Sequence, residues 1–220
     1  MNFEAIIFDL DGTLIDSIPD IADAANQIMM KHHFPVHNAE QYVEWIGNGA
    51  YRLLKRAVPE NISEEYIREL LEEYLEVYRN NCTNKTRLYP GTDHLFDFLN
   101  EQNVPISILT NKPHIITHKV YEKYLSKWNF NVILGQMEGY PKKPDPARAL
   151  EIAEKLNCAP RKVLFIGDSD TDIKTGTAAG MIPIGVIWGY GTEESLKEAG
   201  AKFLIHDTGA LLKFIKKNIT

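Results

Sequence analysis

The fold of this chain is decided by a run of ten residues near its N-terminus, Ala5-Ile6-Ile7-Phe8-Asp9-Leu10-Asp11-Gly12-Thr13-Leu14. Its first four residues are apolar, as in a buried strand, and two carboxylates follow, two positions apart. Because side chains alternate between the faces of a strand, Asp9 and Asp11 point the same way. Gly12 allows a turn that keeps both carboxylates at the carboxyl end of the strand.

The closeness of these two carboxylates calls for a physical reason, because like charges repel each other. We expect the pair to be held by a cation, to share a proton, or to divide the roles of nucleophile and acid or base. The alternative is a solvated turn, since Asp and Gly both favour turns.

Composition and charge exclude several classes of protein. The 220 residues, 44% of them hydrophobic, suffice for one large domain or for a domain that carries a smaller insert. The net charge of -6 argues against nucleic-acid binding, which depends on clustered Lys and Arg. No apolar run approaches the roughly 20 residues that a bilayer-spanning helix needs. We therefore expect neither nucleic acid nor a membrane as a partner.

Cysteine use and the N-terminus bear on the cellular compartment. Cys82 and Cys158 lack CxxC spacing and fit a reducing compartment, where each is a small apolar residue. The first residues show no basic segment ahead of an apolar one, so a secretory signal is not indicated. We expect a cytoplasmic protein that is a monomer or a weak homodimer.

Short apolar runs alternate with segments of helical periodicity along most of the chain. The expected strands are 5–8, 105–109, 132–134, 163–166, 184–187 and 203–205, and the expected helices are 92–99, 116–125, 147–156, 172–179, 193–199 and 210–215. Such alternation produces a parallel sheet with helices on both faces. The predicted fold class is α/β, with a doubly wound, Rossmann-like parallel sheet.

One segment interrupts this alternation. Between residues 16 and 87 no strand is expected, and apolar residues recur at helical spacing from Ile18 to Met29 and from Tyr66 to Tyr78. We predict a helical cap domain over residues 16–87, inserted into a core domain formed by residues 1–15 and 88–220. Two short connectors would join the domains, so the insert is either a lid over the first strand or a rigid decoration.

Three further strand ends carry polar residues. The second strand ends in Thr110 and Asn111, whose hydroxyl, amide and backbone N–H groups suit phosphate oxygens. In Lys142-Lys143-Pro144-Asp145-Pro146, Lys143 is a positioned cation because prolines stiffen the segment, although solvated lysines fit the pattern as well. The fourth strand runs into Gly167-Asp168-Ser169-Asp170-Thr171-Asp172, which places three acids in a short span.

Asp168 follows its strand as Asp9 follows the first strand. In a doubly wound sheet these two strands flank the point where ligands bind, so both carboxylates are expected to face one crevice. Hard oxygen ligands suit Mg²⁺, which takes one or two carboxylates and accepts a further ligand from a substrate phosphate. His114 and His118 lack a third zinc ligand, and Gly47-Asn48-Gly49 lacks the third glycine and preceding strand of a dinucleotide fingerprint.

Taken in order, these residues resemble the four motifs of the haloacid dehalogenase superfamily: Asp9 with Asp11, Thr110, Lys143, and Asp168 with Asp172. The resemblance covers the whole chain, and residues 16–87 look like the helical cap of that superfamily. Within the superfamily, residues 45–50, 110–113 and 167–169 with Asp172 look most like bacterial phosphoglycolate phosphatases.

The resemblance implies a Mg²⁺-dependent phosphomonoester hydrolase that works through an aspartyl-phosphate. Asp9 would be the nucleophile, while Asp11 would protonate the leaving alcohol and then take a proton from the hydrolytic water. Mg²⁺ would be held by Asp9, the backbone carbonyl of Asp11, and Asp168. Asp172 would bind it directly or through a water.

The resemblance also implies which residues contact a small phosphorylated substrate. Gly12, Thr110 and Asn111 would contact the phosphate, and Lys143 would offset its charge. From the cap, Gly47, Asn48 and Gly49 would reach into the cleft. Arg52 is either a clamp for a substrate carboxylate or a solvated arginine.

The expected substrate is a small phosphorylated acid such as 2-phosphoglycolate. The alternative enzyme is a sugar phosphomutase, which would keep the aspartyl-phosphate and exclude water. A signalling module phosphorylated on Asp is an alternative from another class, but such modules are shorter and the insert would be unexplained. A dehalogenase is disfavoured because its chemistry needs no metal.

Overall fold

The strand predicted at the N-terminus, β1 (Ala5–Phe8), lies inside a six-stranded sheet of order β5-β4-β1-β6-β7-β8. The structure is a computed structural model that describes residues 2–219. All neighbouring strands of this sheet are parallel, which confirms the predicted α/β class with a parallel sheet. The other strands are β4 (Ile106–Pro113), β5 (Phe130–Gln136), β6 (Val163–Gly167), β7 (Ile182–Val186) and β8 (Phe203–Ile205).

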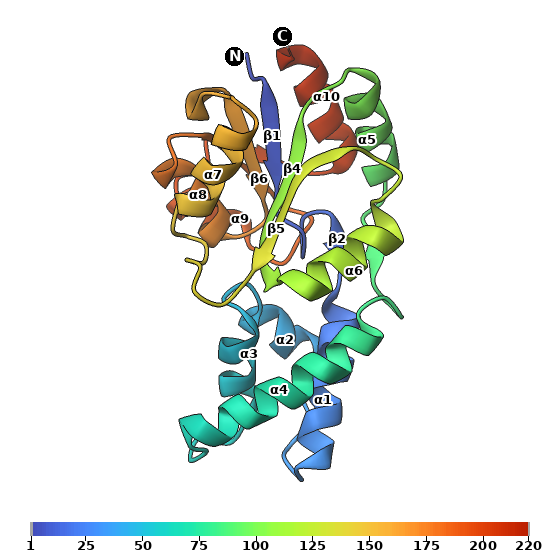
Figure 1. Ribbon diagram of the computed structural model, residues 1–220, viewed down its shortest axis with the longest axis vertical. Helices are drawn as coiled ribbons and strands as arrows, with labels where there is room; N and C mark the ends of the chain where they lie inside the picture. Colours follow the sequence, from blue (N-terminus) through green and yellow to red (C-terminus); the bar gives the residue numbers. More distant parts are fainter. Residues whose placement is uncertain (1, 220) are drawn as a thin grey trace.

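Alternate residues of β1 contribute to two separate hydrophobic cores. Ile6 and Phe8 belong to the larger core, and Ala5 and Ile7 to the smaller one. Helices therefore cover both faces of the sheet, with α5 and α10 on one side and α7 and α8 on the other (Figure 1). The core helices are α5 (Thr92–Glu101), α6 (His114–Tyr124), α7 (Ala147–Lys155), α8 (Asp170–Ala178), α9 (Glu193–Glu198) and α10 (Thr208–Asn218), with a 3-10 turn, η1 (Pro160–Lys162), before β6.

Four helices lie between β2 and β3 in the chain, where the sequence predicts the cap. They are α1 (Ile18–Lys31), α2 (Ala39–Trp45), α3 (Ala50–Ala57) and α4 (Glu64–Asn81). Figure 1 shows them gathered beyond the carboxyl ends of the strands, at the opposite end of the molecule from both termini. We call these four helices the cap. Their position places one wall of any site formed at those strand ends.

The junction between the cap and the sheet corrects one expectation. Two short strands, β2 (Ile15–Asp16) and β3 (Arg87–Leu88), form an antiparallel ribbon there. The expectation of no strand is confirmed for residues 17–86 and wrong only for the end residues 16 and 87. Two residues are too few to show the alternation that marks a strand. The predicted domain boundaries fall inside this ribbon.

None of the helices within residues 2–219 has both the length and the apolar character that crossing a membrane would require.

A buried carboxylate ties the cap to the ribbon. Asp20, in the first turn of α1, is 1% exposed. It accepts hydrogen bonds from the backbone N–H of Lys85 (2.8 Å), and from the backbone N–H (2.9 Å) and hydroxyl (2.8 Å) of Thr86. Hydrogen bonds to a buried charge are stronger than neutral ones, so these contacts hold α1 against the connector that leads into β3.

Asp20→Asn is expected to lower the free energy of unfolding by about 2 kcal/mol or more, because the amide loses the charge and turns one acceptor into a donor. Equilibrium denaturation measures this. The control is Asp23→Asn, in the same helix, which removes an exposed ion pair with Lys85 and should cost less than about 1 kcal/mol. Equal losses in the two variants would show that the buried contacts do not hold the junction.

Candidate active site

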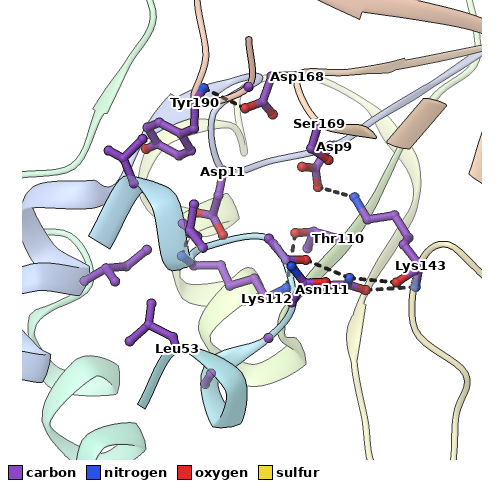
Figure 2. A pocket seen from close by; sticks show the side chains of 18 of the residues that line it. Asp9, Asp11, Leu53, Thr110, Asn111, Lys112, Lys143, Asp168, Ser169 and Tyr190 are labelled. Carbon is purple, nitrogen blue, oxygen red and sulfur yellow. Dashed lines mark hydrogen bonds and ion pairs between the residues drawn. The ribbon is translucent and has the colours of Figure 1, made fainter. Parts of the chain in front are cut away.

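Polar residues at the carboxyl ends of three neighbouring strands meet at one edge of the sheet. β1 lies between β4 and β6, and Phe8 is opposite Ile108 on one side and Ile166 on the other. This pairing confirms that the first and fourth strands of the core are neighbours. Asp9 and Asp168 directly follow β1 and β6, and Thr110 lies in the second half of β4. All three line one cavity of about 560 Å³ whose opposite wall comes from the cap (Figure 2).

The loop after β1 passes very close to Asp168. Gly12 has a φ of 86°, which L side chains rarely adopt, so the predicted turn at this glycine is confirmed. A Cβ added to Gly12 would lie 2.2 Å from Asp168 Oδ2. Glycine is therefore required here both by the turn and by the approach of the carboxylate.

Three carboxylates cluster at the carboxyl end of the sheet, and one ammonium group contacts two of them. Asp9, Asp168 and Asp172 are all buried and each offers an oxygen within 4.8 Å of the others. Lys143 Nζ lies 2.7 Å from Asp9 Oδ1 and 2.6 Å from Asp172 Oδ1. One cation thus faces three carboxylates, so the cluster is short of positive charge.

The shortage of positive charge is visible in the pKa values. Burial, reinforced by the charge of Asp172, raises the pKa of Asp9 to about 8 and that of Asp168 to about 7. Burial alone would lower the pKa of Lys143, but the carboxylates of Asp172 and Asp9 outweigh it and raise that pKa above its usual range. The carboxyl groups of Asp9 and Asp168 would ionise more easily beside a further positive charge. A divalent cation bound to their oxygens would supply that charge.

Asp168 and Asp172 are held rigidly by other residues. Thr13 Oγ1 donates to Asp168 Oδ1 (2.9 Å), and the backbone N–H of Tyr190 donates to Oδ2 (2.8 Å). Asp172 forms a capping box with Ser169, whose backbone N–H (3.0 Å) and hydroxyl (2.6 Å) donate to Oδ2. Both oxygens of Asp172 therefore already have donors, and Asp172 orients Lys143.

Asp11 lies outside this cluster. Its Oδ1 accepts hydrogen bonds from Ser17 Oγ (2.6 Å) and Lys112 Nζ (2.8 Å), and its side chain is 13% exposed. The two predicted acids thus have different surroundings, since Asp9 faces Lys143 and Asp11 faces Lys112. Such a difference suits two carboxylates with different chemical tasks.

The predicted phosphate-binding residues divide into two groups. Thr110 is buried, lines the cavity and accepts a hydrogen bond from the backbone N–H of Lys112 (3.2 Å). Asn111 Nδ2 donates to the carbonyls of Gly47 (3.1 Å) and Lys143 (3.1 Å), while its Oδ1 accepts from the N–H of Lys143 (3.0 Å). The Asn111 amide therefore joins the cap to the Lys143 segment.

The cap reaches the cavity through a loop before α3. Gly47, Asn48 and Gly49 line the cavity, and Gly49 is the N-cap residue of α3, with a φ of 87°. Arg52 is exposed and is not among the described residues that line the cavity, so its interpretation as a solvated arginine fits better.

Several side chains of the site were missed by reasoning from the sequence. Lys112 is the one that the sequence could have revealed. It lies two residues after Thr110, and because strand side chains alternate, the two side chains point to the same face of the sheet. Tyr78 comes from the cap, and the hydroxyl of Tyr190 accepts from the backbone N–H of Ser17 (2.8 Å). Tyr78 and Tyr190 are distant in sequence from the motifs, so no local pattern marks them.

The chain is similar to known hydrolases over nearly its whole length. A family model described as haloacid dehalogenase-like hydrolase matches residues 6–186. A phosphoglycolate phosphatase of Haemophilus influenzae is 32% identical, with 97% of this chain and 99% of the relative covered, and one of Mannheimia succiniciproducens is 31% identical with the same coverage. The crystal structure of a predicted phosphoglycolate phosphatase from Haemophilus somnus superposes with a TM-score of 0.89 at 29% identity, covering 96% of this chain and 97% of that one.

Gly12→Ala is expected to destabilise the protein more than its backbone conformation alone explains. Strain at positive φ costs about 1–2 kcal/mol, and the overlap with Asp168 should add about 1–3 kcal/mol. Gly180→Ala is the matched control, because Gly180 also has a positive φ (69°) but open space around its Cβ position. Unfolding free energies compare the two variants, and equal losses would mean that the loop does not press against Asp168.

Proposed function

The chain belongs to the haloacid dehalogenase-like hydrolase family, and from this premise we propose that it is a Mg²⁺-dependent phosphomonoester hydrolase that acts on a small phosphorylated metabolite through an aspartyl-phosphate. By its family and its relatives the protein is a phosphatase. The metal, the covalent intermediate and the substrate are the proposal. The observation that carries it is the buried cluster of Asp9, Asp168 and Asp172 beside Lys143.

The donor set of this cluster fits a hard divalent cation. Asp9, Asp168 and the backbone carbonyl of Asp11 would hold Mg²⁺, with Asp172 as a further ligand or as the residue that orients a bound water. The raised pKa values of Asp9 and Asp168 support this, because they reflect carboxylates that lack a compensating charge. When bound, Mg²⁺ would supply the positive charge that allows an anionic phosphate to approach an anionic nucleophile.

In the proposed mechanism the two aspartates of the first loop divide the chemistry. An Asp9 carboxylate oxygen attacks phosphorus, the bond from phosphorus to the leaving alcohol breaks, and Asp11 gives its proton to that alcohol oxygen. Asp11 then takes a proton from the water that attacks the aspartyl-phosphate, which releases inorganic phosphate and restores the Asp9 carboxylate. The separate surroundings of the two side chains support this division.

Other residues of the cavity would hold the substrate. Lys143, paired with Asp9, would offset the charge on the transferring phosphoryl group. Gly12, Thr110 and Asn111 would contact the phosphate. The side-chain amide of Asn111 also hydrogen-bonds to the backbone of Lys143 and so fixes that segment. We expect 2-phosphoglycolate to be a substrate, as in the names of the relatives, with Gly47, Asn48 and Gly49 of the cap facing its organic part.

The remaining expectations also belong to the proposal. Two free cysteines, Cys82 and Cys158, suit a reducing compartment such as the cytoplasm. The partner is a small phosphorylated molecule, with no nucleic acid and no membrane involved, and the protein is a monomer or a weak homodimer.

The purified protein is expected to release phosphate from 2-phosphoglycolate over many turnovers with Mg²⁺, and Asp9→Asn should reduce kcat by at least about a thousandfold without loss of folding. Phosphate release and circular dichroism measure the two effects, and a panel of sugar phosphates, nucleotides and pyrophosphate tests selectivity. Isomerisation of a sugar phosphate would identify a mutase instead. One equivalent of stable acyl phosphate would identify a signalling module.

Mg²⁺ is expected to raise the melting temperature more at pH 8 than at pH 6. Carboxyl groups with raised pKa values hold protons in the folded state between about pH 4 and pH 8, so the metal-free protein loses stability as the pH rises through that window. Mg²⁺ must displace these protons at pH 6 but fewer of them at pH 8, so it binds more tightly at the higher pH.

Thermal unfolding with Mg²⁺ and with EDTA, at both pH values, measures this difference. Asp168→Asn is the informative variant, because it removes one carboxylate and should abolish most of the Mg²⁺-dependent increase. An increase that is the same at both pH values, or that survives Asp168→Asn, would contradict the assignment of the metal site.

A further inference from the structure

Lys112 is a buried lysine that joins the sheet to the cap. It belongs to β4, and its side chain is only 1% exposed although it lines the cavity. Nζ donates to Asp11 Oδ1 (2.8 Å) and to the hydroxyl of Tyr78, and it lies 4.7 Å from the centre of the Tyr78 ring. A buried ammonium group requires such partners. One of them, Asp11, comes from the loop after β1 (Figure 2), and the other, Tyr78, comes from α4.

The contacts of Lys112 fix the orientation of the Asp11 carboxylate. Oδ1 of Asp11 accepts two hydrogen bonds, from Lys112 and from Ser17 Oγ (2.6 Å). Within residues 2–219, no hydrogen bond to Oδ2 is found, and Asp11 lines the cavity. The carboxylate is therefore held by one oxygen, and the other oxygen is left for the contents of the cavity.

Tyr78 is itself held firmly by the cap. It is 2% exposed, and its ring stacks on that of Tyr74 at a centroid distance of 5.5 Å. Its hydroxyl therefore meets Lys112 at a position set by α4. Without Lys112, the buried hydroxyl of Tyr78 would lose its hydrogen bond from Nζ, and Asp11 Oδ1 would keep only the hydrogen bond from Ser17.

We propose that Lys112 and Tyr78 are positioning residues that hold Asp11 with Oδ2 toward the oxygen of the leaving group. This inference rests on the proposed function. As the bond from phosphorus to that oxygen breaks, its electron pair stays with the oxygen, which takes the proton from Oδ2. In the second step Oδ2 takes a proton from water, while the water oxygen bonds to phosphorus and the bond from Asp9 to phosphorus breaks.

Substrates whose leaving groups differ in their need for a proton can distinguish two roles of Lys112. If Lys112 positions the acid, only substrates that need protonation are affected, whereas a general structural role affects all of them. An alkoxide needs protonation as it leaves, whereas p-nitrophenolate is stable without it. The substrates are therefore 2-phosphoglycolate, 2-hydroxyethyl phosphate, which lacks the carboxylate, and p-nitrophenyl phosphate. The measured quantity is kcat/KM, because it reports the steps up to departure of the leaving group.

Lys112→Met is expected to lower kcat/KM about 100-fold for both alkyl esters and less than about fivefold for p-nitrophenyl phosphate, since general acid catalysis contributes about 10²–10⁴-fold. Tyr78→Phe removes one oxygen atom and should show the same pattern at about tenfold, so it carries the test if Lys112→Met does not fold. Rapid mixing of Lys112→Met with p-nitrophenyl phosphate should give a burst of one equivalent of p-nitrophenolate, because hydrolysis of the aspartyl-phosphate is slowed.

Two matched controls make the same chemical changes elsewhere at the cap. Lys119→Met removes an exposed lysine of α6 whose Nζ donates to the Arg79 carbonyl of α4 (2.7 Å). Tyr66→Phe removes a hydroxyl of α4 that pairs with His32 Nδ1 (2.7 Å). Neither touches Asp11, so both should keep kcat/KM within about twofold for all three esters.

Three results would overturn the inference. Equal losses for alkyl and aryl esters would give Lys112 a merely structural role, and a loss confined to 2-phosphoglycolate would make it a contact for the substrate carboxylate. Unchanged values for every ester would mean that Asp11 needs neither residue. If the unaltered protein releases phosphate from none of the esters, the proposed function itself fails, and the inference fails with it.

Discussion

The site depends on one electrostatic constraint, which is the burial of three carboxylates with a single ammonium group that pairs with two of them. Asp9, Asp168 and Asp172 lie together because β1 and β6 are adjacent parallel strands, and Lys143 compensates only part of their charge. A fold under no functional pressure would replace such a cluster with apolar side chains, because unpaired buried charge is costly. The hydrogen bonds to Asp168 and Asp172 fix the positions of these carboxylates, as the proposed cation site requires.

Much of this arrangement can be predicted from the sequence, because the periodicity of apolar residues and the position of polar residues after a strand are local patterns. β1 and β8 have the predicted bounds, since a short apolar run between polar residues marks a buried strand. The meeting of Asp9, Thr110 and Asp168 follows from the parallel sheet alone, which places all carboxyl ends at one edge. β7 begins at Ile182, two residues before the predicted start at 184, and it contains Pro183. The proline is tolerated there because pairing with β8 begins only at Ile184.

The rest required the three-dimensional arrangement. Lys112 and Tyr78 meet only because α4 of the cap packs over the end of β4, and no spacing in the sequence relates them. Asn111 had the residue type of a phosphate ligand, yet its amide joins Gly47 to the Lys143 segment, a contact that depends on how the cap lies against the sheet. The antiparallel ribbon at the junction could not be predicted, because each of its two strands has only two residues, too few for a periodic pattern. Contacts between the cap and the core are thus the part that local patterns do not encode.

Calorimetric titration of the metal-free protein with Mg²⁺, at pH 7 in two buffers that differ in ionisation enthalpy, tests directly whether the buried carboxylates bind a divalent cation. We expect one Mg²⁺ to bind per chain with release of protons, because the pKa values of Asp9 and Asp168 are raised to about 8 and about 7. Binding should be lost in Asp168→Asn. Absence of binding at millimolar Mg²⁺, or binding without proton release that persists in this variant, would contradict it.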